Sequence, residues 1–221
     1  MIAATAALVC SLGVAVTVAT ADEPPASEPR HDPGAARELV ALMQAGEAQR
    51  YVADYEITRE RADGATLPTK LTEAHSPRVQ ITRQDETLRI DLADTSYDCQ
   101  RVNDEPTCFR VDGGFGIPQS EVLDAAIAAA PYDALRRGSP TIAGEEAACF
   151  ELTAQNPLRQ LPDLGPRATF CLASDGIPLR TEVEGVGNER REALAVVQSF
   201  DDASLRPLLR GFEKVIPGFG R

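Results

Sequence analysis

Four cysteines, arranged as two pairs that are each symmetric about a central point, constrain the fold of this chain more than any other feature. The pairs are Cys99 with Cys108 and Cys149 with Cys171. Their midpoints fall at Asn103-Asp104 and at Gln160, as expected where two strands face each other across a turn. Structural disulfides form in oxidising compartments. The sequence therefore predicts two β-hairpins, each closed by a cross-strand disulfide, in an exported protein.

The N-terminal segment also predicts export. Residues 2–18 are apolar or small, no charged side chain precedes Asp22, and residues 19–21 (ATA) fit the small-x-small rule of signal peptidase. We therefore expect a signal peptide at 1–21, whose removal takes Cys10 away and leaves four cysteines. A membrane-spanning segment and a lipidated Cys10 are the alternatives. The Ala-rich composition argues against the first, and the nine residues before Cys10 argue against the second.

The charge of the chain restricts its partners. Its 34 acidic and 22 basic residues give a net charge of −12. Because like charges repel, neither nucleic acid nor an anionic lipid surface is an expected bulk partner. The roughly 200 residues after the signal peptide are enough for one domain with a full core.

The first half of the chain is predicted to form a tether, a helix and a meander of strands. Residues 22–31 are Pro-rich and charged, and Asp32-Pro33 is a good helix start for a helix that runs to about Ala48. The apolar period then changes from helical spacing to two, which predicts strands. These strands are expected at 51–58, around 79–81, at 88–92 and in the hairpin 97–111. Alternation of polar and apolar residues favours an antiparallel sheet.

The second half repeats this order. Ser120 is expected to cap a helix from Glu121 to about Ala130, and residues 132–140 are expected to continue this excursion from the sheet. Strands are then expected at 142, 148–154, 168–173, 177–186 and 193–200. The predicted fold class is α+β: a curved antiparallel sheet over residues 32–204, followed by a C-terminal helix over 205–221.

That C-terminal helix is amphipathic and basic. Leucine, phenylalanine, valine and isoleucine recur at i, i+3 and i+4 from Leu205 to Phe219, while Arg206, Arg210 and Lys214 are spaced four apart. Gly211 weakens the helix by roughly 1 kcal/mol relative to alanine. We expect it to close the core, and a lid or a weak contact with a membrane surface is the alternative.

Catalytic and metal-binding patterns are sparse. The two histidines, His31 and His75, have no metal-ligand spacing, and no serine lies in a nucleophile-elbow motif. The sequence therefore predicts no metal, no cofactor and no enzymatic activity. A hydrolase that uses two of the many carboxylates is a further hypothesis, although nothing singles out a pair.

Apolar surface is the remaining candidate for function. A sheet of seven or more strands presents more apolar area than the predicted helices cover, so the sheet either curls on itself or leaves a cavity. Each buried CH₂ of a lipid tail contributes roughly 0.8 kcal/mol, so an acyl chain needs no special polar motif to bind. The alternative is a fully packed core that holds no ligand.

Short motifs in the second half carry a resemblance to a known superfamily. They are Ile142-Ala143-Gly144, Cys149-Phe150-Glu151-Leu152, Phe170-Cys171-Leu172 and Asp175-Gly176-Ile177-Pro178-Leu179-Arg180, with support from Tyr97, Cys99, Cys108 and Phe109. With the order of elements, they resemble the bacterial lipoprotein carriers LolA, LolB, LppX and LprG, and exported actinobacterial proteins of this shape. The resemblance implies a half-barrel with helices on its concave side that holds lipid or lipoprotein acyl chains. It also implies that no metal, cofactor or catalysis is involved.

The predicted ligand-binding residues are the apolar positions of the strands and of the second helix, which is expected to act as a plug. They are Tyr51, Tyr55, Ile57, Val79, Ile81, Leu88, Ile90, Phe109, Val122, Ile127, Phe150 and Phe170. We expect a carrier of a hydrophobic small molecule or lipid in the secreted fraction, the periplasm or the cell envelope. The alternative is an extracytoplasmic regulatory module that binds an envelope protein through its acidic surface, as some relatives bind an anti-sigma factor.

Overall fold

The structure is a computed structural model that describes residues 32–60, 63–113, 118–129, 132–156, 160–161, 164–185, 188–213 and 215. The predicted signal peptide, the tether and Cys10 lie outside these ranges. The helices are α1 (Pro33–Glu47), α2 (Gln119–Ala128) and α3 (Asp202–Leu209). The strands are β1 (Tyr51–Glu60), β2 (Thr66–Ser76), β3 (Val79–Gln84), β4 (Thr87–Leu92), β5 (Thr95–Val102), β6 (Glu105–Asp112), β7 (Tyr132–Arg136), β8 (Thr141–Ile142), β9 (Glu145–Ala154), β10 (Arg167–Ala173), β11 (Pro178–Glu184) and β12 (Glu189–Gln198).

The strands form one open antiparallel sheet in the order β6-β5-β4-β3-β2-β1-β12-β11-β10-β9-β7, with β8 paired to β9. Two meanders, β1–β6 and β9–β12, meet where β1 pairs with β12. The ends of the sheet, β6 and β7, do not pair with each other, so the sheet does not close. The α+β class and the open, curved antiparallel sheet are therefore confirmed.

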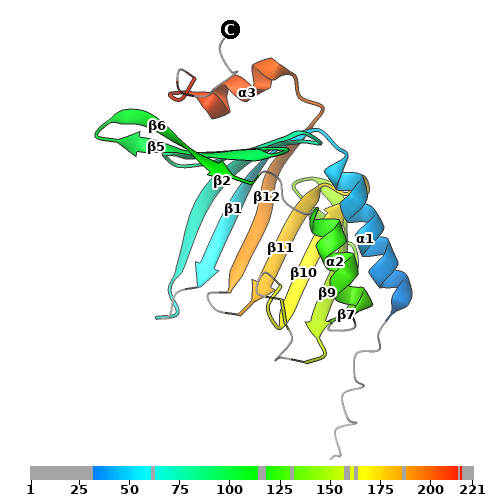
Figure 1. The fold of residues 1–221 in the computed structure, drawn as a ribbon. Coiled ribbons are helices and arrows are strands. Elements are labelled where there is room, and N and C mark those ends of the chain that lie inside the picture. Colours follow the sequence, from blue (N-terminus) through cyan, green and yellow to red (C-terminus); the bar gives the residue numbers. More distant parts are fainter. Residues whose placement is uncertain are drawn as a thin grey trace, which may run out of the picture.

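The sheet bends so that β3–β6 fold over the end of the strands in its centre (Figure 1). The helices α1 and α2 lie side by side on the concave face, in contact with β7. The third helix, α3, lies on the opposite side of β3–β6, which is the convex face. The two helices α1 and α2 therefore lie on the concave side, as the resemblance implied, and α3 is the separately predicted C-terminal helix.

The apolar side of the sheet changes from one half to the other. In β9 and β10 the concave side chains Phe150 and Phe170 pack under the helices, and they lie directly opposite each other. In β3 and β4 the register places Ile81 opposite Ile90, and these side chains pack against α3 on the convex face. The change occurs in β2, where the adjacent residues Glu73 and Ala74 are both buried on opposite faces.

Both predicted disulfides are present. Cys99 and Cys108 are paired across β5 and β6, and Cys149 and Cys171 across β9 and β10. The turn between β5 and β6 has positive φ at both central residues, 53° and 66°, which is the two-residue hairpin turn that matches strand twist. Disulfides of this kind indicate an exported protein.

The first predicted helix is confirmed, with an aspartate cap and a proline at its first position. Asp32 Oδ1 accepts a hydrogen bond of 2.8 Å from the Gly34 amide. The other end of α1 touches the turn between β10 and β11, where a Cβ on Gly46 would lie 2.1 Å from the Gly176 carbonyl oxygen. Glycine at this position therefore permits close contact between helix and sheet.

Two other predictions were wrong in detail, and one strand was missed. The second helix begins at Gln119 after Pro118, so Ser120 lies inside it and does not cap it. Residues 132–136 form the edge strand β7 and do not continue the helical excursion. The strand β2 was not predicted.

The predicted C-terminal helix is also different in extent. It spans Asp202–Leu209 instead of starting at Leu205, and turns follow at 210–213, where Gly211 has φ of +91°. Residues 216–221 lie outside the described ranges. No described helix combines the length and the apolar character that crossing a bilayer requires.

Candidate functional site

The predicted ligand-binding residues do not line one groove. Register places Tyr51, Tyr55 and Ile57 on the concave face together with Phe150 and Phe170. The aliphatic residues of the next two strands lie on the convex face beneath α3; these are Val79, Ile81, Leu88 and Ile90. Their role as ligand-binding residues stays a prediction, but the two groups cannot contact the same ligand on one face.

The remaining three predicted residues are more peripheral. Phe109 is 50% exposed on the edge strand β6, and Val122 is 41% exposed on α2. Ile127 is half-buried against the core between the helices and the sheet. Of the second helix, Leu123 and Ala126 are the residues that face this core.

The core under the two helices combines large side chains on the sheet with small ones on the helices. The sheet supplies Phe150, Leu152, Phe170 and Leu172, all 7% exposed or less. Much of the opposing helical surface is alanine, namely Ala35, Ala36 and Ala126, with Leu39, Met43 and Leu123. We call this set the helix-covered core. Leu123 and Ala126 of α2 are buried in this core, and α2 also contacts α1 and β7.

One carboxylate fastens the start of α2 to the end of α1. Glu47 Oε1 accepts a hydrogen bond of 2.9 Å from the Ser120 amide, and Oε2 accepts one of 2.7 Å from the Ser120 hydroxyl. Ser120 is 1% exposed. An anion at a helix N-terminus satisfies unpaired amides and interacts favourably with the helix dipole. Glu47 therefore fixes one end of α2, and we call this contact the Glu47 clamp.

A buried polar cluster occupies the concave face at the junction of the two meanders. Glu73 is 4% exposed and accepts hydrogen bonds from the Tyr51 hydroxyl at 2.8 Å and from Arg191 Nη2 at 2.7 Å. The Arg191 guanidinium carbon lies 3.7 Å from the centre of the Tyr55 ring, in a cation–π arrangement. The Tyr51 ring stacks on His75 with ring centres 5.1 Å apart. We call these five residues the Glu73 cluster.

The protonation of the cluster is fixed by its own charges. Burial alone would raise the pKa of Glu73, but the Arg191 charge and the hydrogen bonds from Arg191 and Tyr51 hold it below its ordinary value. Burial raises the pKa of Tyr51 and of Tyr55, and the Glu73 charge raises both further. Burial would lower the pKa of Arg191, but Glu73 raises it above its ordinary value. The cluster is therefore an ion pair flanked by neutral tyrosines.

This arrangement is suited to binding or stability more than to proton transfer. A general acid or base needs a pKa near the working pH, whereas the pKa values of Glu73, Tyr51, Tyr55 and Arg191 are held away from it. Arg191 Nε is a buried nitrogen without a hydrogen-bond partner among the described atoms. Within the described ranges, no group of three or more histidine, cysteine, aspartate or glutamate side chains could hold a metal ion.

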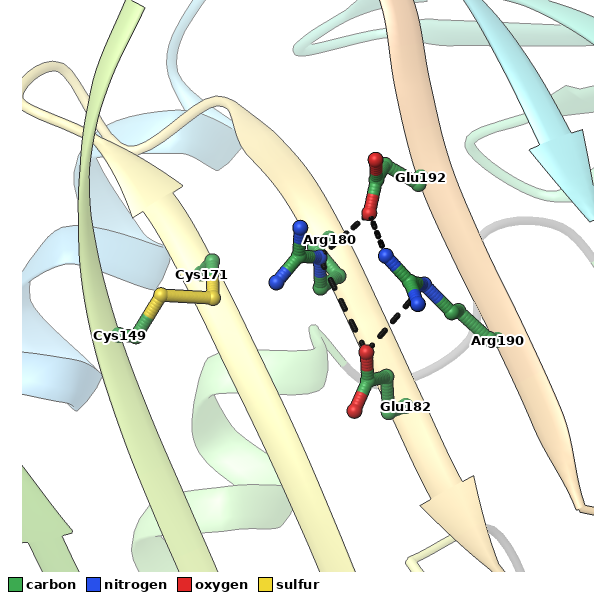
Figure 2. Close-up of a disulfide and its surroundings, with 6 residues drawn as sticks. All are labelled: Cys149, Cys171, Arg180, Glu182, Arg190 and Glu192. Carbon is green, nitrogen blue, oxygen red and sulfur yellow. Dashed lines mark hydrogen bonds and ion pairs between the residues drawn. A yellow bond between two sulfur atoms is a disulfide. The ribbon is translucent and has the colours of Figure 1, made fainter. Parts of the chain in front are cut away.

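The convex face of β11 and β12 is charged. Arg180 on β11 lies across from Glu192 on β12, with 2.6 Å between Arg180 Nε and Glu192 Oε2. Glu182 and Arg190 complete a ring of alternating charge beside the Cys149–Cys171 disulfide (Figure 2). Next to it, a half-open recess of about 410 Å³ is lined by residues of β1, β2 and β12; among them are Glu56, Glu60 and Glu192. This face therefore carries charges of both signs, largely paired with each other.

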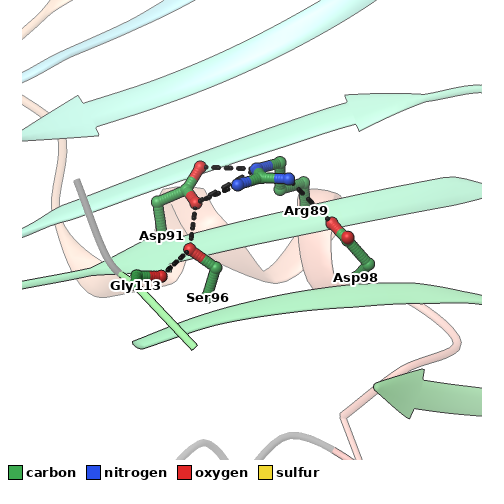
Figure 3. Close-up of polar contacts among 5 residues, drawn as sticks. All are labelled: Arg89, Asp91, Ser96, Asp98 and Gly113. Atoms are coloured by element: carbon green, nitrogen blue, oxygen red, sulfur yellow. Dashed lines mark hydrogen bonds and ion pairs between the residues drawn. The ribbon is translucent and has the colours of Figure 1, made fainter. Parts of the chain in front are cut away.

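The concave side of β4–β6 is polar. Arg89 Nε lies 3.0 Å from both oxygens of Asp91, and Arg89 Nη1 lies 3.2 Å from Asp98 (Figure 3). Ser96 Oγ lies 2.5 Å from Asp91 Oδ1 and 2.8 Å from the Gly113 carbonyl oxygen. Phe109 lies opposite Asp98 and helps to line an open recess of about 490 Å³. An acyl chain is therefore not expected to lie here.

Several residues that shape the site could not be singled out from the sequence. Glu47, Glu73 and Arg191 come from segments 26 or more residues apart in a chain with 34 acidic residues and 22 basic ones. Tyr51 was the one available signal for the Glu73 cluster, because a tyrosine on the apolar side of a strand needs a partner for its hydroxyl. The partner itself follows only from the pairing of β1 with β2.

No protein family and no curated protein sequence matches the chain. Solved structures do match. MucB covers 77% of this chain at 16% sequence identity and a TM-score of 0.42, and the chain spans 62% of the length of MucB. A structure of the Pseudomonas aeruginosa MucA/MucB complex is also matched, with 60% of that chain covered.

Two further solved structures also match. LprF from Mycobacterium bovis has 14% identity and a TM-score of 0.40, with 75% of this chain and 93% of LprF covered. A LolA superfamily protein from Nitrosomonas europaea has 8% identity and a TM-score of 0.34, with 75% and 95% covered.

Proposed function

We propose that this protein is a non-enzymatic carrier that binds an acyl chain of a lipid or lipoprotein between α2 and the concave face of β9 and β10. One observation carries the proposal: large apolar side chains of the sheet lie under a helix that is fixed at one end and rich in alanine. If α2 moves outward, the helix-covered core is opened and its large side chains, among them Phe150 and Phe170, are uncovered. A hydrocarbon chain is the complementary occupant of that surface.

The energetics favour such an exchange. Exposing two phenylalanine side chains to water costs a free energy of about 1.5–3 kcal/mol each. Transfer of ten methylene groups of a ligand from water to this surface contributes about 8 kcal/mol of favourable free energy. The difference is large enough to offset part of the cost of immobilising a flexible ligand. The ligand-free protein needs no preformed cavity, because the ligand would enter the space that opens between α2 and the sheet when the helix moves outward.

Uptake of a fluorescent fatty acid tests the proposal. Protein purified without detergent is extracted for lipid analysis by mass spectrometry, and cis-parinaric acid is then titrated into the delipidated protein. The variant Glu47→Ala breaks the Glu47 clamp, so a larger fraction of molecules has α2 open. Apparent affinity scales with that fraction, and we expect about tenfold tighter binding.

The control is Leu194→Ala. Leu194 is 50% exposed and lines the recess beside β12, away from the two helices. It should leave the affinity for the fatty acid unchanged. Absence of co-purified lipid, together with no uptake by either the parent or Glu47→Ala, would refute the carrier function.

The acidic recess beside β12 supports a second candidate, a module that binds a basic protein partner. Three glutamates and one arginine line it, so its net charge is negative, and the exposed Leu194 adds apolar area; the charged residues are Glu56, Glu60, Glu192 and Arg190. A surface of this kind recognises a partner by charge complementarity, so binding should weaken as salt is raised. Reversal of charge in Glu56→Arg should abolish capture of a defined basic partner, whereas Glu146→Arg on the β8–β9 hairpin should not. Capture that is insensitive to both changes would exclude this recess.

A further inference from the structure

A short segment at the end of the described chain covers an apolar surface on the convex face. Five buried residues of β2–β5 form this surface, which we call the α3 dock: Ala74, Ile81, Leu88, Ile90 and Cys99, each 2% exposed or less. The covering side chains are Phe200, Leu208, Leu209 and Phe212, each 9% exposed or less. The apolar side of α3 is therefore fully engaged in this contact.

One arginine supplies the polar part of the contact. Arg83 Nη1 donates hydrogen bonds to the Leu208 carbonyl at 2.8 Å and to the Arg210 carbonyl at 2.9 Å. These carbonyls lie at the C-terminal end of α3, where a cation also complements the helix dipole. The α3 dock thus has two features that complement α3: an apolar patch, and a cation that binds the carbonyls at the end of the helix. Any copy of this chain carries a helix that satisfies both.

The link between β12 and α3 is strained. Ser199 has φ of +61°, a left-handed conformation that costs a non-glycine residue energy, and its amide bonds to the Arg50 carbonyl at 2.9 Å. The bend at Ser199 turns the chain from the end of the sheet onto the α3 dock. If this residue relaxes to an extended conformation, α3 swings away from its own dock. Short hinges under strain favour the exchange of an element between copies.

We propose that two copies of this protein exchange α3, so that the helix of each copy occupies the α3 dock of the other. The contact in the exchanged dimer is the same contact that the monomer makes, so no new complementary surface is needed. The exchange also relaxes Ser199 in both copies. The occupant of the dock is in this case a second copy of this chain, and the interface is symmetric. This proposal concerns the convex face and does not depend on ligand binding at the concave face.

Complementation between two damaged copies tests the exchange. Phe212→Asp puts a charge into the apolar segment that covers the dock, just after α3, and leaves the dock intact, whereas Arg83→Glu damages the dock and leaves that segment intact. Light scattering after size-exclusion chromatography should show that each variant alone is monomeric. After joint incubation, the two should form a one-to-one dimer, in which the intact helix occupies the intact dock. A mixture that stays monomeric overturns the proposal, as does a dimer of Phe212→Asp alone.

The hinge provides an independent measurement. Ser199→Gly removes the cost of the left-handed conformation from the monomer, so the dimer of otherwise unchanged protein should dissociate at least tenfold more readily. Ala143→Gly is the matched control, because Ala143 also has positive φ, 52°, but lies in the β8–β9 turn. It should not affect the dimer. Equal dimer stability in the parent and in Ser199→Gly contradicts the role of the hinge.

Discussion

The buried ion pair of the Glu73 cluster offers the sharpest test of the structure. Glu73→Gln keeps the shape of the side chain and an oxygen for the Tyr51 hydroxyl, but it removes the charge that neutralises Arg191. Breaking a buried pair on one side costs about 3–5 kcal/mol. Because the Arg191 side chain is 25% exposed, water screens part of its charge, so we expect the lower end, about 3 kcal/mol. For a domain of this size that corresponds to a fall in Tm of roughly 6–12 °C.

Urea unfolding followed by circular dichroism measures this change. The double variant Glu73→Gln with Arg191→Met should recover part of the loss, because no unpaired charge remains. Glu189→Gln is the matched control. It breaks an ion pair with Arg59 in which both side chains are more than 40% exposed, and it should cost under about 0.5 kcal/mol.

The pH dependence gives a second readout of the same pair. The pKa of Glu73 is lower in the folded protein than its ordinary value of 4.5, so its contribution is complete above that value and is lost as pH falls through the folded pKa. The stability gap between the parent and Glu73→Gln should therefore close as pH falls below 4.5. A gap under 0.5 kcal/mol at pH 7, or one that does not change with pH, would show that the pair is not buried as described.

Three further perturbations follow from local geometry. Gly176→Ala places a Cβ at positive φ and within 1.9 Å of a carbonyl oxygen of α1, so it should cost about 3 kcal/mol in urea unfolding. Replacing Cys149 and Cys171 by serine opens a loop of 22 residues and should lower stability by about 3 kcal/mol. Glu47→Ala removes two hydrogen bonds at Ser120 and should cost about 1–2 kcal/mol, measured by thermal unfolding.

Each of these has a control within the chain. Gly138→Ala also has positive φ, 84°, but meets nothing within 4 Å, so it should cost only about 1–2 kcal/mol. Loss of the Cys99–Cys108 bond, which closes a loop of 9 residues, should cost less than loss of the longer one. Glu146→Ala, exposed on the β8–β9 hairpin, should stay within about 0.5 kcal/mol of the parent. Equal effects in a test variant and its control would contradict the geometry.

Symmetry and periodicity made much of the fold predictable. The equal spacing of cysteines about Asn103-Asp104 fixed one hairpin and its disulfide, and alternation from Tyr51 to Ile57 fixed the strand at the junction of the meanders. Both signals are local, because strand pairing across a turn depends on nearby residues. The strand β2 escaped detection because its inward residues include Glu73 and Thr69, which break the apolar alternation.

The site was less predictable than the fold. Alternation shows that Ile81 and Ile90 share a face, but it does not show which side of a curved sheet that face is on. The answer depends on where α3 packs, and α3 is more than 100 residues away in sequence. Glu47 likewise acquires its role only when α2 starts beside it. Long-range packing of this kind carries no local sequence signal.

The described buried apolar side chains form three clusters: one under α1 and α2, one under α3, and a central one around β1 and its neighbours that lies between them. The two clusters under helices share no residue. The core under α1 and α2 belongs to the strands from β7 to β10, and the core under α3 belongs to β2–β5. Detachment of α3, or of α1 and α2 together, would expose the core beneath those helices to water and leave the other end of the protein folded. Amide hydrogen exchange should then reveal two separate opening reactions, with the shared strands β1 and β2 as the slowest to exchange.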